Sequence, residues 1–536
     1  MERNDRPNIL FIMTDQQRAD HLSCYGNKLL KTPNIDRLAE NGVTFDEFYV
    51  ANSTCMPNRA SLITGRMPSV NGVLTNGQSL PVQSNTFVHL LRQGGYRTAL
   101  IGKCHLQNGY WHKIDDSNYP APAAGSPPPE GYTEASLILR QGSDYESERG
   151  DLWLANPARE VETPYYGFED VKFCNAHGDG VHGHYTDWAR KQHPDFNSLI
   201  GPTNAEAADS YVNPIAWKTR VPEELYSTTY VEKMTTQFLN NQARSDKPFF
   251  IQCSFNDPHH PFTPPGSYWG QYDPDDMPVP PSHGTNHNAP PPLQIKLQEA
   301  LDASKRKEVR VEAFACTARE AQEGIALTYD MITMVDAAIG RLLERLSDLG
   351  LAENTIVVFT SDHGDLMGDH GLMLKHCFHT QGTIQVPFIW SDPTTPEKQN
   401  IRTDMLGGTI DIAASVLGRA GLQPYHGMQG QDLVSCFNND KKPDRLGMVV
   451  EEDELPFNAN CDVFMRTRSF VTGKWRMTYW LEDEFGELYD RDEDPHEIHN
   501  LWDDPGISKQ KAELIEMWML ERMALEDMAP RSIYCA

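Results

Sequence analysis

One short segment combines a cysteine with a nearby arginine. In NSTCMPNRASLITGR, Cys55, Pro57 and Arg59 form a Cys-x-Pro-x-Arg pattern, and Pro68 follows in GRMPS. A guanidinium near Cys55 would stabilise negative charge that develops at that residue. A helix beginning just after Cys55 would add the field of its free N–H groups. The alternative without a catalytic role is a reduced, buried cysteine that precedes a helix started by a proline.

Two further pairs of polar residues follow apolar runs with the length of buried strands. Asp15 and Gln16 come after NILFIMT, and Asp362 and His363 come after TIVVFTS. Ligand-binding side chains collect at strand ends in α/β sheets, and a hard divalent cation needs clustered oxygen ligands. SDHGD alone would suggest a capped turn, but together with the Cys55 segment the two pairs predict a metal site. Because the set includes an imidazole, manganese is as plausible as calcium or magnesium.

Basic side chains follow other apolar runs. IGKCH places Lys103 and His105 two residues apart, so an extended backbone would point both side chains the same way. SFNDPHHPF offers His259, with His260 as its nearest rival. These residue types suit proton transfer and the binding of an anion.

Other polar residues are harder to interpret. Lys375 in GLMLKH is a compact ammonium suited to neutralising an anion, whereas the neighbouring His376 and His379 are expected at the surface or at the rim of a site. Asn76 in GVLTNG is either a substrate contact or a turn-forming Asn-Gly. The three histidines of HGDGVHGHYTDW are expected in a loop rather than at a second metal: His177, His182 and His184.

Together these motifs resemble the sulfatase family, in its formylglycine-dependent arylsulfatase and phosphonate monoester hydrolase branch of the alkaline phosphatase superfamily. The resemblance runs from Asn8 to Leu501, where GELYDRDEDPHEIHNL is similar to the family's C-terminal element. It implies that a separate maturation enzyme oxidises Cys55 to formylglycine, whose hydrate carries two hydroxyls on one carbon. It also implies a divalent metal held by five residues: Asp15, Gln16, modified Cys55, Asp362 and His363.

The same resemblance assigns roles to the basic residues. Lys103 contacts the sulfate and the modified residue, and His105 accepts a proton from the hydrate's remaining hydroxyl. His259 binds substrate or protonates the leaving oxygen, a role shared with Lys375, which also neutralises the sulfate oxygens. Catalysis is therefore expected from six residues: Cys55, Arg59, Lys103, His105, His259 and Lys375.

The motifs resemble those of enzymes that act on two different classes of substrate. Gln16, His363 and Asn76 resemble the phosphonate hydrolases, whereas the Lys103–His105 element resembles the sulfatases. The sequence thus predicts hydrolysis of sulfate monoesters, with phosphonate monoesters or phosphodiesters as the alternative. A further alternative is an inactive homologue that binds anionic ligands, which would keep an intact thiol at residue 55 and hydrolyse no ester.

Apolar runs that alternate with helical patterns predict the elements that position these residues. They indicate an α/β fold, and the resemblance implies an alkaline-phosphatase-like large mixed sheet flanked by helices. One long helix, Thr328–Leu349, is expected to precede the strand that ends before Asp362. We expect a catalytic domain at 1–430, with an insertion at about 110–220.

Residues 431–536 are expected to form a smaller C-terminal α+β subdomain. RSFVTGKWRMTYWLEDEFGELYD predicts two or three antiparallel strands. A terminal helix is expected from about Ser508 to Glu526, followed by a tail that ends in Tyr534 and Cys535. Since homo-oligomers are common and this tail could grip another subunit, a dimer or tetramer is expected.

Composition narrows the partners and the location. The 536 residues carry a formal net charge of -28, which disfavours nucleic acid and anionic membranes, so a small anionic ester would need a basic pocket. The apolar stretch Ile9–Met13 is too short for a signal peptide or a membrane span. Ten cysteines without CxxC spacing favour reduced thiols, and the sequence therefore predicts a soluble, cytoplasmic protein.

Overall fold

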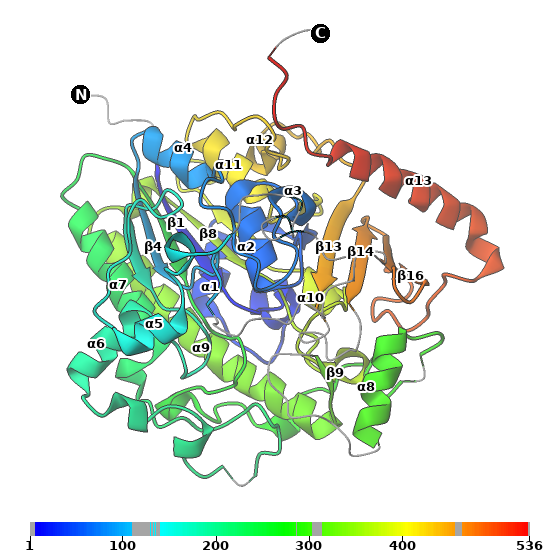
Figure 1. The fold of residues 1–536 in the computed structure, drawn as a ribbon, viewed down its shortest axis with the longest axis horizontal. Coiled ribbons are helices and arrows are strands. Elements are labelled where there is room, and N and C mark those ends of the chain that lie inside the picture. Colours follow the sequence, from blue (N-terminus) through cyan, green and yellow to red (C-terminus); the bar gives the residue numbers. More distant parts are fainter. Residues whose placement is uncertain are drawn as a thin grey trace.

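A mixed eight-stranded sheet forms the centre of the computed structural model, which describes residues 6–109, 129, 132, 135, 140–208, 210–285, 287–302, 313–455 and 464–533 (Figure 1). Strand β10 pairs antiparallel with both of its neighbours, and the other pairs are parallel. In spatial order the strands are β11 (Ile401–Thr403), β2 (Val43–Phe45), β10 (Phe388–Ser391), β8 (Thr355–Ser361), β1 (Asn8–Thr14), β6 (Phe249–Ser254), β4 (Arg97–Gly102) and β5 (Asp170–Phe173).

Strand β1 is buried on both faces because it lies between β6 and β8 in the middle of this sheet. Leu10 and Ile12 join one hydrophobic cluster, and Ile9, Phe11 and Met13 join another on the opposite face. This two-sided burial explains why NILFIM is a continuous apolar run rather than an alternating one. The large mixed sheet with helices on both faces confirms the predicted fold class.

Helices cover the two faces of the sheet. The first face packs against α1 (Pro33–Glu40), α7 (Ser227–Gln242) and α9 (Ala318–Asp348). The second face packs against α2 (Cys55–Thr64), α4 (Phe87–Gln93) and α11 (Asp411–Arg419). Peripheral helices are α3 (Pro68–Asn71), α5 (Gly150–Ala155), α6 (His184–Gln192), α8 (Pro292–Asp302), α10 (Gln381–Ile384) and α12 (Leu433–Asn438).

The long helix α9 begins ten residues before the predicted start at Thr328. A capping box formed by Thr317 and Glu320 opens it, since each side chain bonds the backbone N–H of the other residue. The prediction missed this start because it followed the apolar spacing alone.

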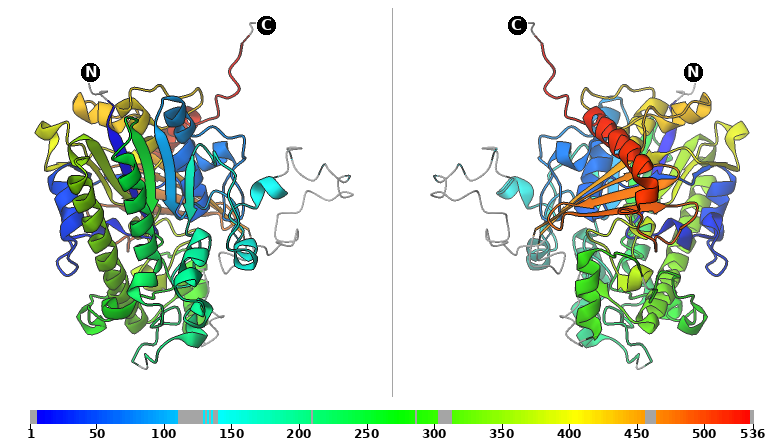
Figure 2. Two further views of the ribbon diagram at one scale, coloured as in Figure 1. Left: turned by 90° about the vertical axis from the view of Figure 1, so that its left-hand side faces the viewer. Right: turned by 90° about the vertical axis from the view of Figure 1, so that its right-hand side faces the viewer.

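The C-terminal region builds a four-stranded antiparallel sheet, which confirms the smaller α+β part. Its strands, in order, are β13 (Met448–Glu454), β14 (Met465–Val471), β15 (Trp475–Trp480) and β16 (Phe485–Asp490). Helix α13 (Ser508–Ala524) lies across this sheet, and the chain after it runs away from the body (Figure 2). Tyr534 and Cys535 lie outside the described residues, as does most of 110–139. The division at residue 430 stays a prediction.

Short strands complete the fold: β3 (Phe48–Tyr49), β7 (Phe314–Ala315), β9 (Leu372–Met373) and β12 (Gly407–Gly408). Within the described ranges, none of the helices has the length and apolar character needed to cross a bilayer. Every cysteine in that part of the chain is a free thiol.

Candidate active site

The carboxyl ends of β1 and β8 bring the two predicted acidic pairs together. These strands are parallel neighbours with Thr14 opposite Ser361, so Asp15 and Asp362 emerge side by side. Both carboxylates are fully buried. The backbone N–H of Gln16 donates to Asp362 Oδ1 at 3.1 Å, and this contact ties the two strand ends together.

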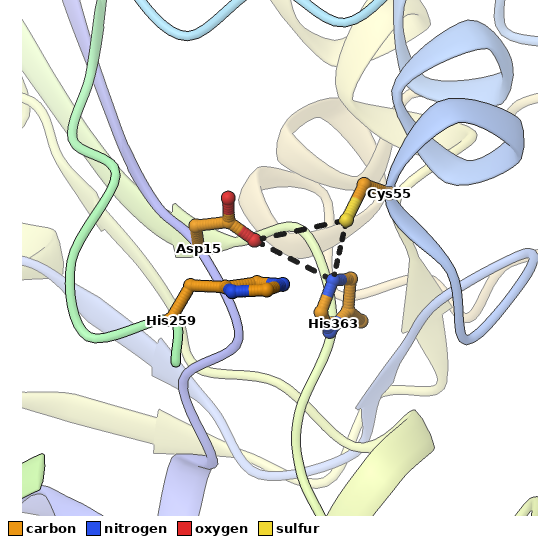
Figure 3. Close-up of side chains that lie close together, drawn as sticks. All are labelled: Asp15, Cys55, His259 and His363. Atoms are coloured by element: carbon orange, nitrogen blue, oxygen red, sulfur yellow. Dashed lines mark hydrogen bonds and ion pairs between the residues drawn. The ribbon is translucent and has the colours of Figure 1, made fainter. Parts of the chain in front are cut away.

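Cys55 is the first residue of α2 and points from the helix N-terminus towards Asp15 and His363 (Figure 3). Its Sγ lies 3.1 Å from His363 Nε2 and 3.9 Å from Asp15 Oδ1. Lys375 Nζ donates to the same sulfur at 3.3 Å. The sequence analysis considered a helix that begins just after Cys55. The structure has this helix begin at Cys55 itself, so its free backbone N–H groups lie beside the sulfur.

Arg59 lies one helical turn after Cys55 and faces the same pocket. Its Nε donates to Asp362 Oδ2 at 2.7 Å, and its Nη1 donates to Ser254 Oγ at 3.0 Å. Nη1 also donates to the carbonyl of Lys103 at 3.0 Å. Arg59 thus fixes three strand ends against α2, and its Nη2 lies 3.9 Å from Asp15 Oδ2.

Lys103 forms a buried ion pair with Asp15 and contacts His177. The distance from Lys103 Nζ to His177 Nε2 is 2.8 Å. The His177 ring stacks on His259 with centroids 3.5 Å apart and an interplanar angle of 8°. His177 was predicted to be a loop residue, and it follows β5 in a loop, but that loop ends inside the site. The strand-like DVKF run shortly before it was the missed signal.

The Lys375 ammonium lies where several donor atoms converge. Nζ is 2.9 Å from His259 Nε2, 2.9 Å from His363 Nε2 and 3.0 Å from Gln16 Oε1. The carbonyl of His260 accepts from His259 Nδ1, so the proton of neutral His259 is on Nδ1 and its Nε2 accepts from Lys375. His260 itself contacts the Gln16 amide through Nδ1 at 3.0 Å. Both candidate histidines therefore lie in the site, but only His259 reaches Lys375.

His105 reaches Cys55 by a different backbone path from the predicted extended one. Its φ is 61°, which is left-handed, because the Glu148 carboxylate accepts the N–H groups of residues 105 to 107 and turns the chain there. Burial lowers the pKa of the His105 imidazole, and the nearby Cys55 opposes that shift. Glu148 belongs to the stretch without recognised motifs, so the sequence did not reveal this turn.

Burial and neighbouring charges shift the pKa values of the acidic groups in the pocket. Burial alone would raise the pKa of the Cys55 thiol, but Lys103, Lys375 and His363 lower it well below its usual range. Burial and the neighbouring Asp362 raise the pKa of Asp15 to about 7. Burial also opposes ionisation of Asp362, yet Arg59 and His363 hold its pKa at about 2. Two adjacent buried carboxylates of this kind favour a bound cation.

The donors present fit a divalent metal ion. Ligand atoms of Asp15, Cys55, His259 and His363 all lie within 4.8 Å of one another, and Cys55 Sγ stands where the oxygens of an oxidised residue 55 would lie. His363 Nδ1 donates to the Gly364 carbonyl at 2.9 Å, so the lone pair of its Nε2, which faces Lys375 and Cys55, could bind a metal ion. Lys375 Nζ also reaches the point where these donors meet.

Three more residues from the sequence analysis lie close to this site: Asn76, His376 and His379. Asn76 Oδ1 accepts the N–H of Met56 at 3.1 Å, so this side chain contacts the start of α2 beside residue 55. The expectation that His376 and His379 lie at the surface is wrong. Both are buried, because carboxylates of β13 approach them from the C-terminal sheet.

Comparisons with known proteins identify related chains. The sulfatase family model matches residues 7–133 and 177–422. A second model, for the C-terminal part of N-sulphoglucosamine sulphohydrolase, matches residues 368–523. The uncharacterized sulfatase YidJ of Escherichia coli (strain K12) is 28% identical over 503 residues, which cover 93% of this chain and 84% of the relative.

An arylsulfatase of Clostridium perfringens is 26% identical over 520 residues, covering 92% of this chain and 90% of its own length. Among solved structures, the phosphonate monoester hydrolase of Agrobacterium radiobacter superposes with a TM-score of 0.74 at 23% identity, covering 98% of this chain and 97% of the other. That structural likeness supports the same fold.

Proposed function

Because this chain belongs to the sulfatase family, we propose that it hydrolyses sulfate monoesters with residue 55 as its nucleophile. The observation that carries the proposal is the convergence on Cys55 Sγ of Lys375 and His363, with the Arg59–Asp362 pair one helical turn away. An inactive anion-binding homologue would not require this arrangement of acids and bases around a cysteine.

The proposed nucleophile is formylglycine, made from Cys55 by a separate maturation enzyme. When formed, its hydrate would supply one hydroxyl that attacks sulfur and a second whose proton can be removed afterwards. The buried position of Cys55 at the start of α2 supports this role, since helix N–H groups and Arg59 favour negative charge at that place.

The proposed metal ligands are the predicted five: Asp15, Gln16, residue 55, Asp362 and His363. A divalent cation bound there would lower the pKa of the attacking hydroxyl and offset charge on the sulfate oxygens. Carboxylate, amide and imidazole donors together suit manganese as well as calcium or magnesium.

The basic residues would then divide the remaining work. Lys103 and Lys375 hold the sulfate oxygens, since both side chains are buried, Lys375 contacts Cys55, and the charges of both lower the pKa of that thiol. Lys375 donates to His259 Nε2, so the proton for the leaving oxygen is available at the Lys375–His259 pair. His105 would accept the proton of the second hydroxyl as the C–O bond to sulfate breaks, which releases sulfate and restores the aldehyde of residue 55.

Peptide mass spectrometry across residue 55 tests the nucleophile. The protein should be co-expressed with a maturation enzyme and then assayed on aryl sulfate esters. A mass that matches the aldehyde or its hydrate, together with turnover, supports the proposal. Complete thiol despite competent maturation, with no ester hydrolysed, would favour the inactive anion-binding homologue.

Phosphonate monoesters or phosphodiesters are the second candidate substrates. Gln16 and His363, both in contact with Lys375, are the residues that favour them. The ratio of kcat/KM on aryl sulfate and aryl phosphonate esters separates the two activities. A ratio above one supports sulfate as the substrate class, and a ratio below one supports phosphonates.

Substitution of His177 should reduce catalysis through Lys103. In His177→Ala the Lys103 ammonium loses an acceptor and is drawn towards Asp15, and His259 loses its stacking partner. A hydrogen bond to a charged group contributes about 1.5–3 kcal/mol, so kcat/KM on an aryl sulfate should fall roughly tenfold to hundredfold. His177→Gln keeps an acceptor and should recover part of the rate.

His193→Ala is the control for this test, because His193 follows α6 in the same insertion and no contact between its side chain and Lys103, His105 or His259 is seen in the described structure. Its kcat/KM should stay near that of the wild type. Equal rates for His177→Ala and His193→Ala would show that the His177–Lys103 contact has no part in catalysis.

Removal of divalent ions should lower both activity and stability. After treatment with a chelator, turnover should fall to a small residual rate, and calcium, magnesium and manganese added singly will identify the ion that restores it. An ion at 100 times its Kd stabilises the folded state by about 2.7 kcal/mol, so Tm should rise with the same ion. Unchanged turnover and Tm after chelation would contradict a metal site.

The proposal also covers the location and the assembly of the protein. Free thiols throughout the described part of the chain support a cytoplasmic location. We also propose a homodimer or homotetramer, which size-exclusion chromatography with light scattering would establish.

A further inference from the structure

The loop that carries Lys375 has an unusual backbone. Leu374, His376 and Cys377 all have left-handed φ angles, of 74°, 76° and 58°. Bulky side chains rarely adopt this conformation because it brings Cβ close to the backbone, so the loop persists only where its surroundings hold it. Lys375 lies inside this strained stretch, and its Nζ reaches Cys55 at 3.3 Å.

Two carboxylates of β13 hold the loop. Glu454 Oε2 accepts from His376 Nδ1 at 2.9 Å, and Glu452 Oε2 accepts from His379 Nε2 at 3.0 Å. All four side chains are buried. The Glu452 Oε1 atom lies 3.9 Å from His376 Nδ1, so both carboxylates face the same imidazole.

The same carboxylates also hold the segments around the nucleophile. Ser53, two residues before Cys55, donates from Oγ to Glu452. Thr75 Oγ1 donates to Glu454 Oε1 at 3.0 Å, next to Asn76, which contacts the start of α2. The end of β13 therefore connects the Lys375 loop with two segments close to residue 55, one containing Ser53 and the other containing Thr75 and Asn76.

The charges of this cluster are complementary. Burial alone would lower the pKa of His376, but Glu454 and Glu452 raise it above its usual value. Burial opposes ionisation of Glu452, yet His379 and His376 hold its pKa at about 2. A cationic His376 between two carboxylates gives an ion-paired link whose loss would leave a buried charge without its partner.

We propose that Glu452 and Glu454 are positioning residues, which act through His376 and His379 to hold the strained loop so that the Lys375 ammonium is aimed at residue 55. This inference rests on the proposed sulfatase activity. It assigns the C-terminal sheet a part in catalysis, because two of its buried side chains set the position of a proposed catalytic lysine.

His376→Asn is the sharpest test, because asparagine tolerates a left-handed backbone while it removes the imidazolium. With the full-length, matured protein and an aryl sulfate, kcat should fall roughly tenfold to hundredfold, since a small misplacement of a catalytic group has an effect of that size. KM should change less, because charge on the leaving oxygen develops only in the transition state.

Glu454→Gln removes the carboxylate partner of His376 on β13. It serves as the second variant should His376→Asn fold poorly. Glu451→Gln is the matched control, since Glu451 is buried on the same strand but accepts the N–H of Ser69 instead. Its kcat should remain near that of the wild type. Tm of each variant reports whether the fold is intact.

A double-mutant cycle with Lys375→Ala separates positioning from general damage. If His376 acts through Lys375, His376→Asn should lower kcat less than about twofold in the Lys375→Ala background. Equal penalties in both backgrounds, or wild-type kcat for His376→Asn and Glu454→Gln, would overturn the positioning role alone. A matured wild-type protein without turnover would overturn the proposed function and this inference together.

Discussion

Cys55→Ala is expected to remove essentially all ester hydrolysis, with a loss of about 10⁴-fold or more in kcat. The reason is that no other nucleophile in the described site is placed to replace it. Lys375, His363 and Asp15 all face the sulfur of residue 55. Alanine would leave these groups in place around an inert methyl group, so substrate binding should survive the loss of chemistry.

Cys55→Ser gives a more informative partial defect. Serine has one hydroxyl where the hydrate would have two, so it can attack sulfur but offers no second proton for His105 to remove. The variant should release up to one equivalent of alcohol per subunit and then stop. Sustained turnover by Cys55→Ser at the wild-type rate would contradict the need for an aldehyde.

The assay compares burst and steady-state release of a chromogenic alcohol by wild type, Cys55→Ala, Cys55→Ser and a control. Cys174→Ala is the control, because Cys174 is a buried thiol in the hydrophobic cluster on the first face of the sheet. Its loss should affect stability by little and kcat not at all. Near-normal kcat in Cys55→Ala would rule out residue 55 as the nucleophile.

The sequence predicted the groups that follow recognisable apolar strands. Asp15 and Asp362 were expected at strand ends, and they lie side by side because β1 and β8 are parallel neighbours that end at one edge. Arg59 was expected near residue 55, and it lies one helical turn after it. The same reasoning placed Lys103 directly after β4 and His259 in the segment that follows β6. Periodicity and strand-end geometry are local properties, so one sequence suffices to reveal them.

What the sequence missed depends on contacts between distant segments. His177 was not recognised because its loop has no motif, and only the fold stacks it on His259. His376 and Glu454 are 78 residues apart, and their pairing depends on how the C-terminal sheet docks. Polar side chains with no apolar pattern around them look like surface residues until their partners are known, and for that reason His376 was expected at a rim.

Asp362→Asn is expected to damage stability and catalysis together. Asp362 pairs with Arg59 Nε at 2.7 Å, and both side chains are buried. Removing one partner of a buried ion pair costs about 3–5 kcal/mol, because the remaining charge is left without compensation. The change also weakens a proposed metal ligand, so kcat/KM should fall by about 10²-fold or more, and the concentration of metal ion needed for half-maximal rate should rise.

Asp336→Asn separates the two effects. Asp336 is also a buried carboxylate, but it accepts the N–H groups of Asn34 and Ile35 at the start of α1, on the first face of the sheet. It should lower Tm while leaving kcat per folded molecule unchanged. For Asp362→Asn, recovery of rate at high metal concentration would assign the defect to the ligand role. A rate that stays low at saturating metal would assign it to the Arg59 pair, and wild-type kcat/KM in a folded Asp362→Asn protein would contradict both roles.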